Sequence, residues 1–335
     1  MSQVIVVGAS AGGVEAATQV IRRIPADVAA PILVVLHISS NAASALPDIL
    51  QRAGELPAHH PVDYEPLRNG LVYVAPPDHH LLLGPEGTVR VVRGPRENGH
   101  RPAIDPLFRS AARYYGERAI GIVLSGALDD GAAGLRVLTD AGGTAIVQDP
   151  EDALYASMPE HALAFGEVRH VVPAGDMGPL VGKLVAELAG QQGEEQPMAE
   201  DRDRVDMELA LTALEPVHEG DRLAPASHFS CPDCHGVLNE IAEGDEVRFR
   251  CRVGHAWSPE SLLAALTDGL ENALWMALRT LEEKASLARR LATRARDAET
   301  SHSQRRFEQQ AADAQQGADA IRALIARASI VVPPR

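Results

Sequence analysis

The sequence lacks any apolar run approaching the ~20 residues that a membrane-spanning helix needs. Its N-terminus also lacks a charged, apolar and cleavable leader, and opens directly into strand-like residues. We therefore expect a cytoplasmic protein without membrane insertion. Basic residues are in deficit as well. The net charge of -15 argues against nucleic acid as a partner and favours a protein partner.

Cysteine is scarce, and the three in the chain all lie between residues 231 and 251. An odd count in one short segment does not suit a disulfide scaffold and indicates reduced thiols that bind a metal. A histidine completes a C-x2-C-x16-C-x3-H pattern: Cys231, Cys234, Cys251 and His255. Four protein ligands favour a structural zinc with no open position for catalysis; a redox dithiol or free buried thiols are the alternatives. His228 and His235 are rival fourth ligands.

The 335-residue chain has room for two domains, and its first part alternates strand-like and helix-like stretches. Short apolar runs predict buried strands at residues 4–7, 31–37, 119–125, 143–148 and 168–172. Helical patterns lie at residues 14–23, 44–53, 105–115, 135–141, 158–165 and 179–189. Residues 70–92 alternate and contain proline and glycine turns, which predicts a β-hairpin excursion. The fold class is therefore α/β, with a doubly wound and mostly parallel sheet.

Composition divides the chain into four regions. They are the α/β domain at residues 1–189, a polar linker with a short helix (205–214) at 190–225, a zinc-ribbon-like module at 226–257 and a helical tail at 258–330. Leucines at three-and-four spacing between residues 262 and 291 form an apolar stripe on the tail, and a second helical run spans 303–328. We expect the two runs to pair as a long helical hairpin. Self-association or binding of a regulatory protein is the alternative.

A turn of small residues at 8–13 follows the first strand and contains Ser10. Glycines there allow backbone or substrate to approach closely, and free N–H groups at the helix start can receive negative charge. Ser10 is therefore a candidate nucleophile. A phosphate or dinucleotide turn is the alternative, although the spacing is G-x-x-x-G-G and not G-x-G-x-x-G.

His37 closes the second strand, and Asp129 and Asp130 follow the strand at 119–125. Because the carboxyl ends of parallel strands share one edge of a sheet, Ser10, His37 and one of the two aspartates can converge. In a Ser-His-Asp triad the carboxylate orients the imidazole, and the imidazole takes the serine proton. Service as caps and turn formers is the alternative role for these residues.

Several short sequence blocks follow one another along the chain. They are GASAGG at 8–13, LHI at 36–38, YVAPPDHH at 73–80, RPAIDPLFRSAA at 101–112, LSGALDDGAAG at 124–134, QDP at 148–150 and SMP at 157–159. Over about residues 4–184 they resemble the catalytic domain of CheB-type chemotaxis protein-glutamate methylesterases of bacteria. The resemblance implies that Ser10 is the nucleophile, His37 the base, and Asp130 rather than Asp129 the acid.

Members of that family hydrolyse glutamate γ-methyl esters on the cytoplasmic helices of chemoreceptors, releasing methanol through an acyl-enzyme, and some also deamidate glutamine. The resemblance therefore implies a hydrolase of signal transduction that needs no cofactor for catalysis and has methylated receptor helices as partners. It places oxyanion stabilisation at the backbone N–H groups near Ala11 and Ala127. Arg101 and Arg109 belong to a basic cluster that would meet the receptor on the substrate side; its other members are Arg93, Arg96, His100 and Arg113. Solvated surface charge is the alternative.

Three residues depart from the family pattern. Ala11 stands where threonine is common, and Ala127 and Leu128 stand where methionine and glycine are common. The resemblance begins at the first catalytic strand, so we expect no receiver domain ahead of it. The zinc-binding and helical segments look like the accessory tail of some receiver-less relatives. A second hypothesis is therefore a catalytically weak signalling adaptor that keeps the fold and binds partners through this tail.

Overall fold

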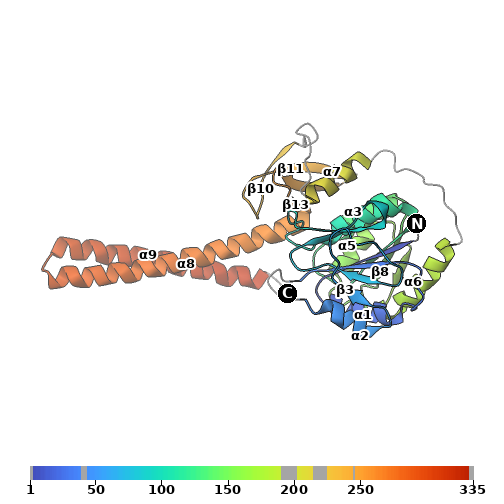
Figure 1. Ribbon diagram of the computed structural model, residues 1–335. Helices are drawn as coiled ribbons and strands as arrows, with labels where there is room; N and C mark the ends of the chain where they lie inside the picture. Colours follow the sequence, from blue (N-terminus) through green and yellow to red (C-terminus); the bar gives the residue numbers. More distant parts are fainter. Residues whose placement is uncertain (1–2, 39–43, 190–201, 214–224, 244–245, 332–335) are drawn as a thin grey trace. The chain divides into compact units, whose positions relative to one another are not determined.

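The computed structural model describes residues 3–38, 44–189, 202–213, 225–243 and 246–331. The chain divides into two compact units, Met1–Leu262 and Leu263–Arg335. Figure 1 shows the elements of both. Within the described ranges no helix has the length and apolar character required to cross a membrane.

A seven-stranded sheet forms the centre of the first unit, with the strand order β3-β4-β2-β1-β7-β8-β9. Its strands are β1 Val4–Ala9, β2 Ile32–Leu36, β3 Ala58–His59, β4 Val72–Val74, β7 Ala119–Val123, β8 Thr144–Gln148 and β9 His170–Val172. All neighbouring strands run parallel. The predicted α/β fold is therefore confirmed. The sequence missed β3, which is two residues long and too short for a periodicity. It also assigned the residues of β4 to the hairpin excursion, whereas β4 pairs with β2 in the sheet.

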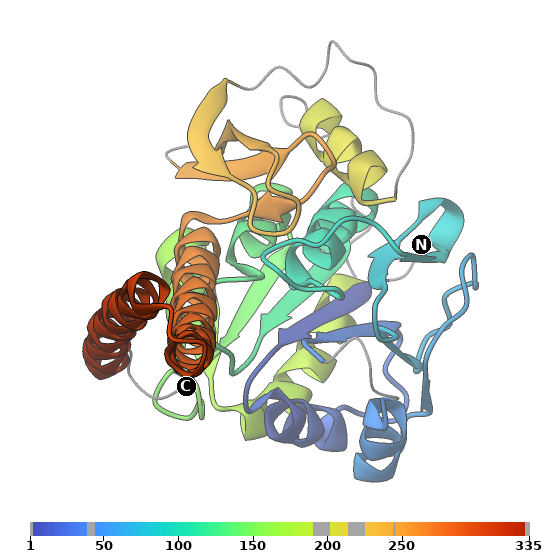
Figure 2. The ribbon, with the colours of Figure 1, turned by 90° about the vertical axis from the view of Figure 1, so that its left-hand side faces the viewer.

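Helices cover both faces of this sheet (Figures 1 and 2). One layer holds α1 Gly13–Arg23, α2 Leu46–Ala53 and α6 Ala174–Ala189, and the other holds α3 Ile104–Tyr115, α4 Ala132–Asp140 and α5 Ser157–Phe165. Along β1, Val4 and Val6 enter one core while Ile5 and Val7 enter the other. Both faces are dry, so the strands are continuous apolar runs rather than alternating ones.

The predicted hairpin excursion is also present. It consists of β5 His80–Leu83 and β6 Val89–Val92, which pair antiparallel and add side chains to the core on the α3 side. One-turn helices cover Pro85–Gly87 and Gly116–Arg118. The hairpin leaves the sheet after β4 and returns the chain to α3, so it lies next to the carboxyl edge of the sheet.

Strand β1 is the point where the direction of winding reverses, because β1 pairs with β2 on one side and with β7 on the other. In open α/β sheets, ligands bind in the crevice beyond the carboxyl ends of the strands at such a switch point. The turn after β1 and the loop after β7 face this crevice. Both were singled out by the sequence.

The C-terminal part of the first unit contains helix α7 Arg202–Thr212, which lies against α3. It also contains an antiparallel sheet of β10 Ala226–Ser230, β11 Val237–Glu243, β12 Glu246–Cys251 and β13 Ala256–Trp257. The predicted helix at 205–214 corresponds to α7, and residue 214 is outside the described residues. This ribbon belongs to the same compact unit as the parallel sheet. The predicted domain boundaries at 189 and 225 stay predictions.

Two long helices, α8 Pro259–Asp297 and α9 Ser301–Val331, form the predicted helical hairpin. Part of the predicted leucine stripe packs against α9, namely Leu274, Leu278 and Leu281, whereas Leu263, Leu266, Leu270 and Leu287 are exposed. Alanines supply further buried positions, namely Ala285, Ala288, Ala292, Ala311, Ala314 and Ala318. Small side chains allow two helix backbones to approach closely. Arg322 on α9 also pairs with Glu282 on α8.

Candidate active site

Ser10 lies in a turn that only small residues can form. The turn leads from β1 into α1, and Gly12 within it has a φ of 71°. A Cβ atom on Gly12 would come within 2.7 Å of the Ser125 Oγ. Ser125 also accepts the Ser10 amide hydrogen through its carbonyl, at 3.0 Å. The glycines therefore serve the packing of the turn and the placement of Ser10.

His37 connects Ser10 to a buried carboxylate. Its Nδ1 lies 3.1 Å from the Ser10 Oγ, and its Nε2 lies 2.7 Å from the Asp130 Oδ2. The two side chains of His37 and Asp130 are 6% and 2% exposed. An ionised carboxylate accepts only, so Nε2 carries the proton and Nδ1 is free to accept the serine hydroxyl. In the usual Ser-His-Asp template the two ring nitrogens have the opposite roles.

Asp130 is held as a carboxylate by its surroundings. Burial pushes its pKa upward, but hydrogen bonding and charge from His37 outweigh this effect and keep the pKa below its ordinary value. The Ile104 amide donates to Oδ2 at 2.7 Å, and the Asn98 Nδ2 donates to Oδ1 at 3.0 Å. Asp105, next to it, is the opposite case, since burial and the charge of Asp130 raise its pKa well above the ordinary value.

The neighbouring Asp129 does not face His37. Its Oδ1 accepts the hydroxyl groups of Ser258 and Ser261, both at 2.9 Å. Burial raises its pKa. The geometry thus separates two aspartates that the spacing alone left equivalent, with Asp130 at the imidazole and Asp129 at the start of α8.

A family model described as CheB methylesterase matches residues 5–181. This chain belongs to the CheB methylesterase family. That family is one of carboxylic ester hydrolases, and the match spans the sheet and the loops that hold Ser10, His37 and Asp130. The match ends before α7, the ribbon and the helical hairpin.

Individual proteins of the family give the same result. Protein-glutamate methylesterase/protein-glutamine glutaminase 2 of Anaeromyxobacter dehalogenans (strain 2CP-C) is 41% identical over 175 residues, which are 52% of this chain and 51% of that protein. A putative protein-glutamate methylesterase/protein-glutamine glutaminase of Leptospira interrogans serogroup Icterohaemorrhagiae serovar Lai (strain 56601) is 37% identical over 170 residues, 51% of this chain and 88% of the other. This chain therefore spans about half the length of the first relative.

A solved structure has the same fold. The crystal structure of the Thermotoga maritima CheB methylesterase catalytic domain superposes with a TM-score of 0.53 at 30% sequence identity. The superposition covers 55% of this chain and 99% of that domain. The first half of this chain is thus a whole CheB-type catalytic domain, and the remainder is additional.

Leu128 is one of the three departures from the CheB pattern and lies just before the aspartate pair. Its φ of 62° is in the left-handed region, which costs a residue with a side chain roughly 1–2 kcal/mol. The Ser157 hydroxyl donates to its carbonyl at 3.2 Å. The loop therefore keeps a backbone that suits glycine even though leucine occupies it.

The oxyanion assignment stays a prediction. The amide of Gly126, next to Ala127, donates to the Tyr155 carbonyl at 3.0 Å. The amides of Ala11 and Ala127 donate to no other residue in the described part of the chain. Both belong to loops at the carboxyl edge of the sheet, beside Ser10 and before Asp130.

The two arginines expected on the substrate side have different positions. Arg101 is 16% exposed and pairs with Asp78, while its Nη1 donates to the Gly94 carbonyl at 2.6 Å. Arg109 is 1% exposed and forms ion pairs with Glu97 and Glu208. Burial within its own ion pairs removes Arg109 from any substrate surface, so the expectation for this residue is corrected. The role of Arg101 stays a prediction.

Sequence reasoning did not predict the roles of two further residues at the site, because it counted His100 only in the basic cluster and did not single out Asn98. His100 stacks on His37, with ring centroids 3.7 Å apart and planes 13° apart. Burial, followed by the charge of His37, lowers the pKa of His100 to about 3. Asn98 donates to Asp130, as described above. Asn98 and Gly99 have φ values of 52° and 76°, and such an Asn-Gly pair is the usual signal of a tight hairpin turn.

The predicted metal ligands come together in the ribbon. The ligand atoms of Cys231, Cys234, Cys251 and His255 all lie within 4.8 Å of one another. His228 and His235, the rival ligands, are exposed and lie outside this group. Burial raises the pKa of Cys231 to about 11, so its thiolate requires a nearby cation. Three thiols and an imidazole in this arrangement fit tetrahedral zinc.

Proposed function

We propose that this chain is a serine hydrolase that removes γ-methyl esters from glutamate residues of chemoreceptors. The observation that carries the proposal is the hydrogen-bonded series Ser10, His37 and Asp130. It lies in a domain of a methylesterase family, and the relatives described above are named protein-glutamate methylesterases. The methylated cytoplasmic helices of receptors are the partners that this reaction requires.

The first half-reaction forms an acyl-enzyme. His37 Nδ1 accepts the proton of the Ser10 hydroxyl as Oγ attacks the ester carbonyl, and Asp130 stabilises the imidazolium through Nε2–H. The amides of Ala11 and Ala127 donate to the oxyanion, which is where charge develops in the transition state. His37 then returns the proton to the methoxide, so methanol leaves and the acyl group stays on Ser10.

The second half-reaction reverses these roles. His37 takes a proton from water, hydroxide attacks the acyl carbonyl, and Ser10 leaves with the proton that His37 gives back. A glutamate carboxylate is released. A glutamine side chain forms the same acyl-enzyme with ammonia as the leaving group, and the names of the relatives include a protein-glutamine glutaminase. We extend the proposal to this deamidation.

Catalysis needs no cofactor in this scheme, and the metal has a structural role. Cys231, Cys234, Cys251 and His255 would hold Zn²⁺ with four protein ligands, which leaves the metal no position for a substrate or water. Bound zinc would supply the link between the two knuckles of the ribbon. The helical hairpin stays a predicted surface for self-association or for a regulatory protein.

Methanol release from methylated receptor helices tests the esterase. We expect release by the native protein and none above background by Ser10→Ala. Ser301→Ala, which changes an exposed serine of α9, is the matched control and should behave as the native protein does. Equal release by the native protein and Ser10→Ala would end the esterase proposal and leave the adaptor hypothesis.

A further inference from the structure

Asn98 uses its whole side chain to connect the triad to the C-terminal ribbon. Its Nδ2 donates to the Asp130 Oδ1 at 3.0 Å and to the Asp105 Oδ2 at 3.2 Å. Its Oδ1 accepts the Ser258 amide hydrogen at 2.8 Å. The residue is 3% exposed. A buried amide with its donors and its acceptor all engaged has one favourable orientation.

The turn that carries Asn98 also contacts the imidazole of the triad. Glu97 and His100 exchange backbone hydrogen bonds at 3.2 and 2.9 Å, which closes a two-residue hairpin. His100 stacks on His37. One short turn therefore touches two of the three triad members, the acid through Asn98 and the base through His100.

The same turn is attached to the ribbon by its backbone. The Asn98 amide donates to the Ala256 carbonyl at 2.8 Å, and the Ala256 amide donates to the Arg96 carbonyl at 3.2 Å. Ala256 directly follows His255, whose Nδ1 faces the thiols of Cys231 and Cys251. The metal cluster and the turn are thus joined through two adjacent residues of the chain.

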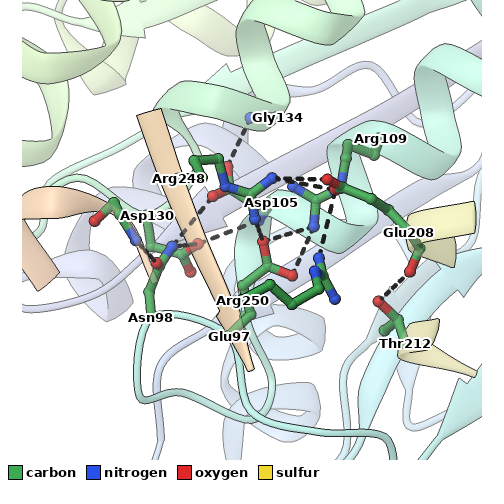
Figure 3. Close-up of polar contacts among 12 residues, drawn as sticks. Glu97, Asn98, Asp105, Arg109, Asp130, Gly134, Glu208, Thr212, Arg248 and Arg250 are labelled. Carbon is green, nitrogen blue, oxygen red and sulfur yellow. Dashed lines mark hydrogen bonds and ion pairs between the residues drawn. The ribbon is translucent and has the colours of Figure 1, made fainter. Parts of the chain in front are cut away.

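A buried ionic cluster strengthens this attachment (Figure 3). Glu97 pairs with Arg109 of α3 at 2.6 Å and with Arg248 of β12. Glu208 of α7 pairs with Arg109 at 2.9 Å and with Arg248 at 3.1 Å. All four side chains are at most 4% exposed. If the ribbon moved away, Glu97 and Glu208 would each lose the ion pair with Arg248, and breaking a buried ion pair is costly.

From these contacts we propose that Asn98 is a positioning residue for the triad acid, and that the metal-held ribbon keeps Asn98 in place. The reactivity of Ser10 then depends on metal binding in the ribbon, although the ribbon contributes no residue to the triad. The inference rests on the proposed serine hydrolase function and on the metal site. It assigns to the ribbon an indirect role in catalysis, through the position of the triad acid.

The test compares Asn98→Gly with the removal of metal. Glycine tolerates the left-handed backbone of position 98, so this variant removes the side chain and keeps the turn. Metal is removed by Cys234→Ser or by a chelator, and Val253→Ser, at an exposed position of the second knuckle between Cys251 and His255, is the control. Four quantities are measured on the full chain: zinc content, kcat and KM for the methyl ester, the labelling rate of Ser10 by a fluorophosphonate, and the downfield NMR signal of the His37 Nε2 proton.

We expect Asn98→Gly to retain zinc and its KM, and to lose roughly 10- to 100-fold in kcat and labelling rate, the size of one lost hydrogen bond to a charged group. The His37 proton signal should shift or broaden. Metal removal should reduce the native protein to the same degree and reduce Asn98→Gly by less than about twofold further, because both changes release the same contact. Val253→Ser should match the native protein.

Three results would overturn the proposal: an Asn98→Gly variant within about twofold of the native labelling rate with an unshifted His37 signal, losses that multiply when both changes are combined, or a metal-free protein with native Ser10 reactivity. Labelling of Ser10 without methanol release would refute the proposed substrate alone, since the labelling and NMR results still judge Asn98. A native protein that neither labels nor hydrolyses would overturn both. If Cys234→Ser does not fold, chelation of the native protein supplies the same comparison.

Discussion

His100 lies flat against the imidazole of His37, at a centroid distance of 3.7 Å. The pKa of about 3 means that His100 is neutral at physiological pH. It therefore packs on His37 without repelling the positive charge that His37 would gain in the proposed mechanism. His100 follows the turn of Asn98 and Gly99, so the same turn shields one face of the ring and orients the acid beyond it.

This stacking predicts a loss of stability in acid. An unfolded histidine titrates near pH 6.5 and folded His100 near 3, so the unfolded state binds more protons between these values. The free energy of unfolding then falls with decreasing pH by up to about 1.4 kcal/mol per unit. His100→Phe keeps an aromatic ring and removes this proton. We expect urea unfolding at pH 4 and pH 7 to differ by about 1–3 kcal/mol less in His100→Phe than in the native protein, with His302→Gln on the exposed helical hairpin as the control. If the stability difference between pH 4 and pH 7 is the same in His100→Phe as in the native protein, His100 is protonated at pH 4 in the folded state as well.

The aspartate pair gives a second prediction. Asp130→Asn should lower kcat by about 10⁴-fold, because an amide no longer selects the imidazole form that carries its proton on Nε2. Asp129→Asn keeps an oxygen that accepts from Ser258 and Ser261, and should stay within about threefold of the native kcat. The pair of variants differs by one position and is measured with the same ester. Equal losses would contradict the assignment of Asp130.

Leu128 allows a test of backbone strain. Leu128→Gly relieves the left-handed conformation, while Leu128→Ala removes the same side chain and keeps the strain. We expect the glycine variant to be about 1 kcal/mol more stable than the alanine variant in urea unfolding. Elsewhere, alanine is the more stabilising of the two residues because glycine gains more entropy on unfolding. A more stable alanine variant would therefore mean that this turn is unstrained.

The metal site predicts a stoichiometry and a ligand set. The purified protein should contain about one zinc per chain, and Cys231→Ala, Cys251→Ala and His255→Ala should each lose it. His235→Ala, in the first knuckle, should retain it. Metal analysis and thermal unfolding measure both effects. Zinc that persists in His255→Ala and disappears in His235→Ala would reassign the fourth ligand.

The buried ionic cluster predicts that replacing a buried arginine lowers the free energy of unfolding more than replacing an exposed arginine does. Arg109→Leu leaves Glu97 and Glu208 buried with one partner fewer, and should cost about 3–5 kcal/mol of unfolding free energy. Arg322→Leu breaks an ion pair on the surface of the helical hairpin. It should leave the thermal unfolding of the Met1–Leu262 unit unchanged. An equally mild effect of both changes would indicate that water reaches the cluster.

Sequence patterns predicted the parallel sheet because its strands are apolar on both faces and its turns contain glycine. They also brought Ser10 and His37 to one edge, since each residue ends a strand of that sheet. Asp129 and Asp130 stayed equivalent, because adjacent positions in a loop differ only in the direction that the backbone gives them. The resemblance to a known family selected Asp130, and the hydrogen bonds of the structure agree with that choice.

The errors have a common physical origin. Arg109 was assigned to the substrate side together with Arg101, and only tertiary contacts with Glu97 and Glu208 show that it is buried. Asn98 had a local signal in its Asn-Gly turn, but its partners lie 32 and 160 residues away along the chain. Contacts between residues so far apart in the sequence cannot be predicted from short-range periodicity.

The positions of Asp129 and Asp130 also determine whether the catalytic domain can be separated from the C-terminal segment. Asp130 binds the imidazole of His37 and the adjacent Asp129 binds the first turn of α8. A single peptide bond therefore separates the proposed triad from the attachment of the C-terminal segment. A chain cut after residue 189 would remove the hydroxyl groups of Ser258 and Ser261 from Asp129, the Ser258 amide from Asn98 and Arg248 from Glu97. To keep these contacts, a chimaeric protein that uses this catalytic domain would also have to include the ribbon and the start of α8.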